Sequence, residues 1–353
     1  MTGRESHRRS FLVRRFCSRR AEAVNGASAP VSEAQQPGLL GRIPSIDQFR
    51  GYAILTMIFV NFIGRFDATP WMLKHHRIGM SFNDTIAPIF IFVVGMGFRL
   101  SLMRRAEKDG LAAARKAAAW RYAKLAILGF IVYAGYFWDA LSDIGVAGLL
   151  TLFLIDKSPA VRIAAAFGLL GAYQALFSLA GYGEWVMRES VNGGPLGPLS
   201  WAFILLMGTV AYDLMREGGT GAILRRCTAW GLALSAAGWL LKMPWPGLKP
   251  EWPFTQYGMS APYPIYATGL CFLTLLVFHL LCDVSRIRLP HLTVLGENPL
   301  ALYLLHGVLI LIGHLILNAD APPHAIALGF ILIYAICYTC AVVLHRKKII
   351  FKL

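Results

Sequence analysis

Charged side chains are scarce in this chain of 353 residues. Asp, Glu, Lys and Arg make up 15% of it, against 56% hydrophobic residues, and the mean hydropathy is +0.55. Because so few charges cannot cover the surface of a water-soluble protein of this length, the composition excludes an ordinary soluble enzyme. It is typical of an all-α, polytopic membrane protein built as a helical bundle.

Cysteine is also scarce, and the familiar soluble-enzyme motifs are missing. Of the six cysteines, all but Cys17 lie in or beside apolar runs, so we expect neither a disulfide framework nor a metal site. Cys337 and Cys340 form a CxxC within an apolar run, where packing is the expected role. No P-loop, dinucleotide fingerprint, HExxH or GxSxG motif occurs. Soluble-enzyme chemistries are therefore disfavoured.

Acidic residues are few relative to basic ones, 19 against 34, which gives a net charge of +15. Such an excess suggests nucleic-acid binding, but the basic residues cluster at the ends of apolar runs and in every second connection. That placement is typical of the positive-inside rule. We therefore predict a lipid bilayer and no nucleic acid as partner, with both termini in the cytosol.

Residues 1–44 lack any apolar run long enough to span a membrane. The pair of arginines in HRRSFLVRRF resembles an export signal, but no apolar region follows it. We predict a disordered, basic cytosolic tail, with a membrane-surface helix around Phe11–Phe16 as the alternative. Residues 45–353 then form one transmembrane domain.

Ten apolar runs within residues 45–353 are candidate membrane spans. The fourth is short, and Asp139 and Asp143 beside it leave a bent passage as the alternative. An even number of spans agrees with two cytosolic termini. The predicted spans are 48–65, 84–102, 122–139, 143–156, 160–180, 198–214, 224–242, 264–282, 294–317 and 324–344.

Two long outer connections, 181–198 and 242–264, are rich in Trp, Pro and Gly. One interpretation is an interfacial aromatic belt with turns. The other is a vestibule for a sugar, because aromatic rings pack on the apolar faces of pyranoses while Glu184, Glu189 and Glu251 accept hydrogen bonds. The sequence leaves both open.

The first span carries a polar stripe made of Asp47, Arg50 and Asn61. On a helix these three positions fall within about 60° of one another, and Arg50 and Asn61 lie about 16 Å apart along the axis. Polar groups in hydrocarbon are costly, so the stripe should face a protein interior or a watery cavity. It is the first candidate for a functional site.

The region from Ser45 to Gly95 contains S-x-D-x-F-R-G, M-I-x-V-N, L-K-H and D-x-x-x-P-x-F-x-F-x-x-G in order. This pattern resembles the start of the heparan-α-glucosaminide N-acetyltransferase family. The chain has HHRIG where the family usually has H-A-x-W-N-G, which leaves the acceptor and the choice between His75 and His76 open. The matching residues are Ser45, Asp47, Phe49, Arg50, Gly51, Met57, Ile58, Val60, Asn61, Leu73, Lys74, His75, Asp84, Pro88, Phe90, Phe92 and Gly95.

The resemblance implies a catalytic role for His75, which corresponds to the family's catalytic histidine. An imidazole serves either as a nucleophile toward a thioester or as a base for an attacking amine. Asp84 either caps the second span or orients the imidazole. Asn61 either donates a hydrogen bond to an oxyanion or joins two helices.

The donor is expected at the inner end of the bundle. Arg50 and Asp47 either pair with each other or bind the phosphates of acetyl-CoA. The segment GENPLALYLLHG resembles a late motif of the same family, and its Asn298, Tyr303 and His306 line the route of the cofactor or bond neighbouring helices.

Together these features predict a membrane acyltransferase. By resemblance it moves an acetyl group from cytosolic acetyl-CoA to a sugar or amino-sugar acceptor on the outer face, in the cytoplasmic membrane if the source is bacterial. The alternative is a multi-pass transporter or flippase for a glycan or lipid-linked substrate, in which the same polar residues line a permeation route. The sequence leaves a homo-oligomer open.

Overall fold

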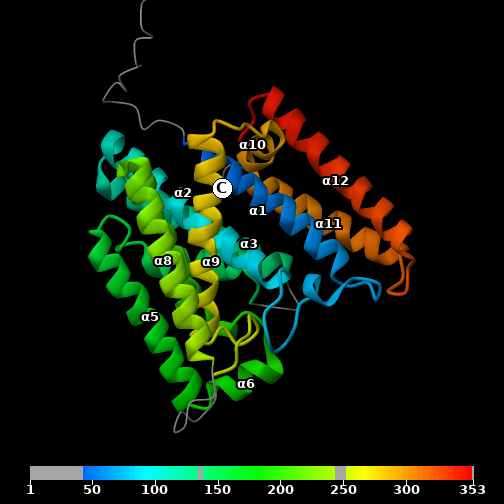
Figure 1. Ribbon diagram of the computed structural model, residues 1–353, viewed down its shortest axis with the longest axis horizontal. Coiled ribbons are helices and arrows are strands. Elements are labelled where there is room, and N and C mark those ends of the chain that lie inside the picture. Colours follow the sequence, from blue (N-terminus) through cyan, green and yellow to red (C-terminus); the bar gives the residue numbers. More distant parts are fainter. Residues whose placement is uncertain (1–42, 134–137, 243–251, 352–353) are drawn as a thin grey trace, which may run out of the picture. The chain divides into compact units, whose positions relative to one another are not determined.

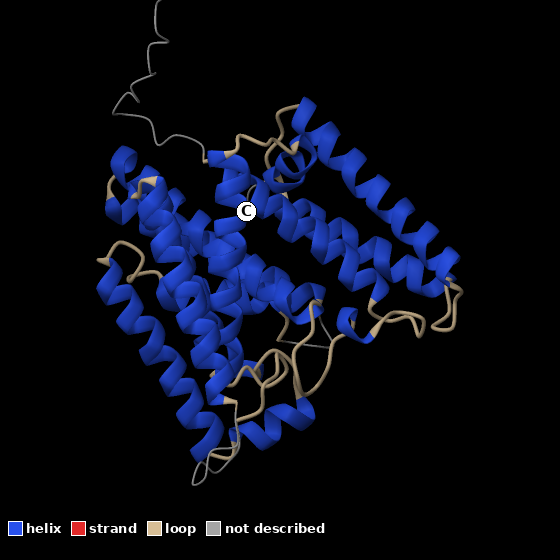
Figure 2. Cartoon of the chain, viewed as in Figure 1, coloured by secondary structure: helices blue, strands red, loops and turns tan. Residues whose placement is uncertain are grey.

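A computed structural model describes residues 43–133, 138–242 and 252–351. The predicted tail, except for its last two residues, and Glu251 of the second outer connection lie outside the described residues. Within the described ranges the chain forms helices and loops and no strand (Figures 1 and 2). The all-α prediction is confirmed.

Twelve α-helices occur in these ranges, joined by loops and short helical turns. Two of them, α6 and α10, are only eight residues long. A π-helical turn, His279–Val284, extends α9. The helices are α1 (Pro44–Ile63), α2 (Ile86–Asp109), α3 (Leu111–Val132), α4 (Ala140–Thr151), α5 (Pro159–Leu179), α6 (Tyr182–Glu189), α7 (Gly197–Glu217), α8 (Thr220–Leu241), α9 (Pro262–Phe278), α10 (Pro290–Glu297), α11 (Pro299–Ile316) and α12 (Pro323–Arg346).

Each of the ten predicted spans overlaps a helix. Within the described residues, six helical segments, which contain α2, α5, α7, α9, α11 and α12, are long and apolar enough to cross a membrane. The helices α1, α3, α4 and α8 are shorter, less apolar or more charged. The chain is therefore an integral membrane protein, and the count of ten crossings stays a prediction.

Two predicted boundaries are wrong. The ninth run, 294–317, is not one helix, because Asn298 breaks it into α10 and α11 with φ −125° and ψ 58°, and Pro299 begins the second helix. The predicted spans 84–102 and 122–139 leave a long connection between them, but α2 continues to Asp109 and α3 begins at Leu111. Gly110, with φ 84°, makes the turn between them.

Helix α7 forms the centre of the core and is buried along most of its length. Glycines allow it to lie very close to α2. A Cβ atom at Gly95 would lie 2.1 Å from the Leu205 carbonyl oxygen, and one at Gly208 would lie 2.1 Å from the Phe92 carbonyl oxygen. Small residues of this kind let helix backbones approach each other in membranes.

A buried ion network joins α2, α5 and α7. The Asp213 carboxylate of α7 accepts hydrogen bonds from Arg99 Nε at 2.9 Å and from Arg162. Arg162 is fully buried and also donates to Thr209 Oγ1 at 2.7 Å. Because each charge has a partner, the network fastens three helices together without leaving a bare ion in the interior.

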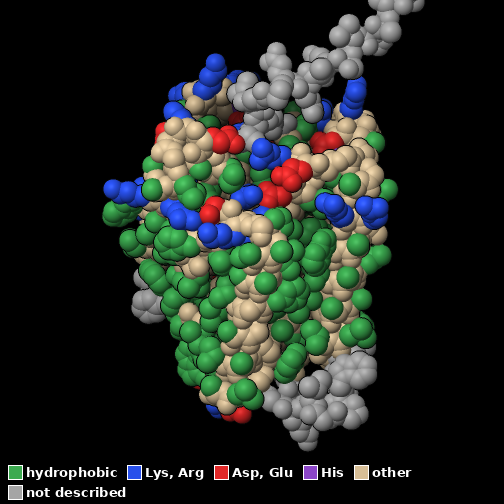
Figure 3. Space-filling model, turned by 90° about the vertical axis from the view of Figure 1, so that its left-hand side faces the viewer, with side chains coloured by type: hydrophobic (Ala, Val, Ile, Leu, Met, Phe, Trp, Pro, Cys, Tyr) green, Lys and Arg blue, Asp and Glu red, His purple; other side chains and the backbone are tan. Residues whose placement is uncertain are grey.

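The first and last described residues lie at the same end of the bundle. Gly296 of α10 packs on Asp47 of α1, and Asn298 Nδ2 donates to the Ile349 carbonyl oxygen at 3.1 Å. On the face drawn in Figure 3, Lys and Arg gather toward one end and a broad apolar band lies below them. This arrangement suits a membrane helix bundle; that the termini face the cytosol stays a prediction.

Candidate active site

The loop between α1 and α2, residues 64–82, carries the two histidines and is closed by its own hydrogen bonds. Asn83 Nδ2 donates to the Leu73 carbonyl oxygen at 3.2 Å, and the Phe82 N–H donates to the Met72 carbonyl oxygen at 3.0 Å. Ser81 Oγ lies 2.7 Å from the Lys74 carbonyl oxygen, immediately before His75. The loop therefore presents His75 from a fixed backbone.

The imidazole of His75 forms a hydrogen bond with Asp84, Nδ1 to Oδ1, at 2.7 Å. The side chain of His75 is 40% exposed, whereas that of Asp84 is fully buried. A carboxylate only accepts hydrogen bonds, so Nδ1 carries the hydrogen and Nε2 keeps its lone pair. Nε2 is then able to accept a proton or to attack a carbonyl carbon.

Asp84 is itself held in place from two sides. Its Oδ2 accepts the Ser81 N–H at 2.8 Å, and the hydroxyl of Tyr263 on α9 donates to its main-chain carbonyl at 2.7 Å. Asp84 lies in a short 3₁₀ turn before α2, whose first residue is Ile86, and its carboxylate makes no capping bond to that helix. Of the two predicted roles, the geometry matches the orienting carboxylate.

His76 has a different environment. Its ring stacks on Trp71 with ring centroids 4.3 Å apart, and its Nε2 lies 2.9 Å from the Trp71 carbonyl oxygen. Because a carbonyl accepts, Nε2 carries the hydrogen. His76 packs within the loop, so of the two histidines the carboxylate orients His75.

Asn61 and His306 lie far apart in the sequence and meet between α1 and α11. Asn61 Nδ2 is 3.2 Å from His306 Nε2. His306 Nδ1 bonds the carbonyl oxygen of Tyr303, so that nitrogen is the donor and Nε2 accepts from the amide. The hydroxyl of Tyr303 in turn bonds that of Tyr133 at the end of α3. A continuous polar chain therefore joins three helices.

Near the start of α1, Arg50 and Asp47 form an ion pair at 3.6 Å, with both side chains partly exposed. Gly296 packs directly on this turn of α1, because a Cβ atom added at Gly296 would lie 3.4 Å from the Arg50 Cβ. Asn298, predicted beside them as a cofactor ligand, uses its amide otherwise. Its Nδ2 donates to Ile349 and its Oδ1 accepts the Phe351 N–H at 2.8 Å, so Asn298 holds the C-terminal segment.

Sequence reasoning did not assign a role to the polar residues that meet behind the histidine loop. Asp139 caps α4, and its Oδ1 accepts Asn192 Nδ2 at 3.0 Å. Asn192 Oδ1 accepts Gln256 Nε2 at 3.0 Å. The only sequence signal was the pair of acidic residues interrupting an apolar run.

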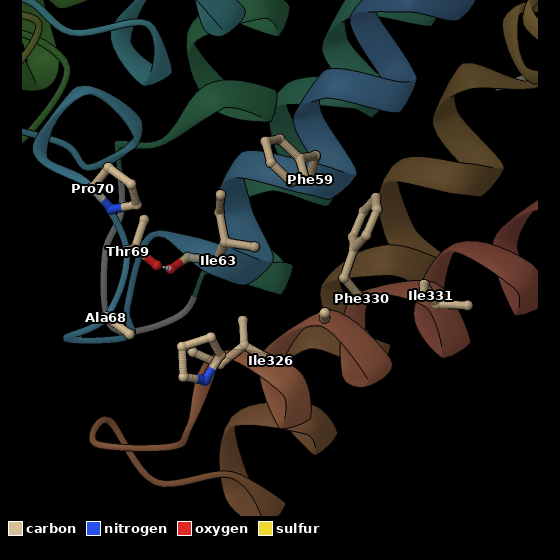
Figure 4. Close-up of a pocket in the computed structure, with 10 residues that line it drawn as sticks. Phe59, Ile63, Ala68, Thr69, Pro70, Ile326, Phe330 and Ile331 are labelled. Atoms are coloured by element: carbon tan, nitrogen blue, oxygen red, sulfur yellow. Dashed lines mark hydrogen bonds between the residues drawn. The ribbon is translucent and has the colours of Figure 1, made fainter.

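A cavity of about 320 Å³ opens beside the C-terminal end of α1 (Figure 4). Phe59 and Ile63 of α1 face Ile326 and Phe330 of α12 across it. Its one drawn polar contact is internal, from Thr69 Oγ1 to the Ile63 carbonyl oxygen at 2.6 Å. The cavity contains none of the predicted site residues, and its apolar walls suit a lipid-facing position.

Comparison with known families places this geometry in context. A sequence model described as "Heparan-alpha-glucosaminide N-acetyltransferase, catalytic" matches residues 42–218, half of the chain. The chain belongs to this family. Human heparan-alpha-glucosaminide N-acetyltransferase is 34% identical over 96 residues, which cover 26% of this chain and 14% of the human protein.

The heparan-alpha-glucosaminide N-acetyltransferase match runs from α1 to the end of α7. It includes Arg50, Asn61, His75 and Asp84, and also the unpredicted Asp139 and Asn192. Tyr303, His306 and Gln256 lie beyond it. The resemblance at the late motif is therefore carried by the sequence pattern, and the hydrogen bond of His306 with Asn61 is one of the contacts that join this motif to the matched region.

Proposed function

We propose that this protein is a membrane acetyltransferase that moves an acetyl group from cytosolic acetyl-CoA to a sugar or amino-sugar acceptor on the outer face. The observation that carries the proposal is the His75–Asp84 pair, 2.7 Å apart with a fully buried carboxylate. A buried carboxylate on Nδ1 fixes the tautomer and stabilises the imidazolium that forms when Nε2 takes a proton. Acyl transfer needs such a base or nucleophile.

Asn61 is the second element of the proposed centre. It lies in the last turn of α1, and its amide is oriented by His306 with one Nδ2 hydrogen engaged. Its second hydrogen is the donor that we assign to the oxyanion of the transition state. A preorganised donor of this kind stabilises the charge that develops on the oxyanion.

We place the donor nucleotide at the inner end, beside Arg50 and Asp47. A guanidinium binds phosphate in a bidentate fashion, and Arg50 lies about 16 Å from Asn61 along α1. Its ion pair with Asp47 is partly exposed, so a phosphate has access to it. Tyr303 and His306 then line the passage along which the thioester reaches His75. Asn298 is left out of this set, since its amide holds the C-terminal segment.

The test is transfer of radiolabel from acetyl-CoA by the purified, detergent-solubilised protein, with glucosamine and its oligosaccharides as acceptors. Wild type should label the acceptor, His75→Ala should not, and His76→Ala should retain activity because it packs on Trp71. If wild type transfers no label and binds no acetyl-CoA, the acetyltransferase proposal is wrong. The protein is then to be assayed as a glycan transporter.

A further inference from the structure

Three outer segments converge on the histidine loop. The Gly79 N–H donates to the Phe254 carbonyl oxygen at 2.7 Å, and the Arg77 guanidinium lies over the Tyr257 ring, 5.6 Å from its centroid. The Gly193 N–H donates to the Tyr257 carbonyl oxygen at 2.9 Å. Figure 1 shows the loop after α1, helix α6 and the segment before α9 together at the end of the bundle opposite α10. His75 is therefore surrounded by residues from several elements.

Within this convergence, amide and carboxylate side chains form a row. Gln256 donates to Asn192, and Asn192 donates to Asp139, each at 3.0 Å. Asn192 adopts φ 56°, a left-handed conformation that asparagine tolerates better than most residues, and its carbonyl oxygen accepts from Trp201 Nε1 at 3.0 Å. The row is held by the backbone and is partly exposed at Asp139.

Among the described residues, buried acceptor atoms in this row and one turn beyond it have no hydrogen-bond partner. They are Oε1 of Gln256 and Oδ1 and Oδ2 of Asp143. Asp143 is fully buried and lies one turn after Asp139, on the same face of α4. Burying an acceptor without a donor is unfavourable, so a ligand that supplies donors would relieve these atoms.

The charge of the row is also unbalanced. The Asp139 carboxylate accepts hydrogen bonds from the Ala140 and Ser142 N–H groups and from Asn192, and within the described residues no Lys or Arg pairs with it or with Asp143. The Nδ1 of His75, on the neighbouring loop, is already bonded to Asp84, so Asp139 is free to bind a positive group of a ligand.

We propose that Asp139, Asn192 and Gln256 form the acceptor subsite, and that the Asp139 carboxylate binds the protonated amine of the acceptor. The subsite thus selects an amine over a hydroxyl acceptor. This inference rests on the proposed acetyl transfer. The ammonium gives one proton to His75 Nε2, and the amine nitrogen attacks the thioester carbon. The C–N bond forms and the C–S bond breaks, the thiolate takes the proton from His75, and the second amine proton passes to water.

The substitution Asp139→Asn tests the charge alone. Asparagine caps helices about as well as aspartate and keeps an acceptor oxygen for Asn192. Calorimetric titration of the purified full chain with glucosamine should show at least tenfold weaker binding in Asp139→Asn. Binding of glucose and of acetyl-CoA should stay unchanged. The matched control is Asp320→Asn, an exposed carboxylate between α11 and α12, which should bind glucosamine as wild type does.

A second variant covers the case in which Asp139→Asn does not fold, as judged by lost acetyl-CoA binding. Gln256→Ala removes an acceptor for sugar hydroxyls and should weaken glucosamine and glucose alike. The inference is overturned if a folded Asp139→Asn protein binds glucosamine as tightly as wild type does. If Asp139→Asn does not fold, unchanged glucosamine affinity in Gln256→Ala overturns it. A wild type that does not bind glucosamine also overturns it. If wild type transfers acetyl groups but does not bind glucosamine, the proposed function still stands. If wild type binds glucosamine but transfers no acetyl group, only the proposed function is rejected.

Discussion

Asp84 illustrates how much one buried carboxylate determines at this site. One oxygen accepts from His75 and the other from the Ser81 N–H, which has no alternative but to donate. The carboxylate suits both neighbours because it accepts at both oxygens. The carboxylate thus sets the tautomer of His75, and the Ser81 N–H, two residues before the helical turn that carries Asp84, holds the carboxylate in position.

We predict that Asp84→Asn removes most of the acetyltransferase activity while the fold persists. The Ser81 N–H requires the amide oxygen, so the amide nitrogen faces His75 and donates to Nδ1. Nε2 then carries the hydrogen and cannot accept a proton. Loss of the correct tautomer costs on the order of 10²–10⁴-fold in kcat.

Steady-state kinetics with saturating acetyl-CoA check this prediction, with Asp67→Asn, an exposed carboxylate of the same loop, as the control. The KM for acetyl-CoA should change little, because Asp84 lies at the opposite end of the bundle from Arg50. A kcat close to that of wild type would show that Asp84 does not orient a catalytic base.

At the scale of the helices, close backbone contacts and one ion network position the site. Gly95 and Gly208 bring α2 and α7 together, and α2 begins two residues after Asp84. The Asp213 network fastens the other end of α2 to α5 and α7. The helix that carries the carboxylate at its start is therefore fixed along its length.

We predict that Asp213→Ala destabilises the bundle by about 3–5 kcal/mol, because it leaves Arg99 and the fully buried Arg162 without their carboxylate. The free energy of unfolding, measured by denaturant titration in detergent, checks this value. The control is Arg105→Ala, whose exposed pair with Asp109 at 3.4 Å should contribute at most about 1 kcal/mol. Equal effects of the two substitutions would contradict the assignment.

At the scale of the whole molecule, the Arg50–Asp47 ion pair and the His75 loop lie at opposite ends of the helix bundle. The ion pair of Arg50 and the C-terminal segment share one end, and the His75 loop lies at the other. Donor and acceptor sites on opposite faces of a membrane require this separation. The positive-inside rule predicts that the end with Arg50 is cytosolic.

Cysteine labelling tests that orientation. In a cysteine-free background, Asp320→Cys should react with a membrane-impermeant maleimide in intact spheroplasts, whereas Arg105→Cys should react only after permeabilisation. Both positions are exposed in the fold, so access depends on the membrane alone. The reverse pattern would place His75 in the cytosol and remove the basis for transfer across the bilayer.

The sequence by itself determined the class of protein, most helices and the identity of the histidine loop. These follow from local information, since apolar runs of spanning length and rare polar residues in order are visible without a fold. It misplaced the break at Asn298 and the turn at Gly110, because an apolar run continues through the first and basic residues surround the second.

Only the tertiary structure decided which polar groups meet. The contacts of Asn61 with His306, of Tyr133 with Tyr303, and of Asp139 with Asn192 join residues 245, 170 and 53 positions apart. No periodicity records such pairs, because they depend on which helix faces another and not on either helix alone. The orientation of His75 likewise depends on the tertiary structure, because the loop has to fold back to place the Asp84 carboxylate next to the imidazole.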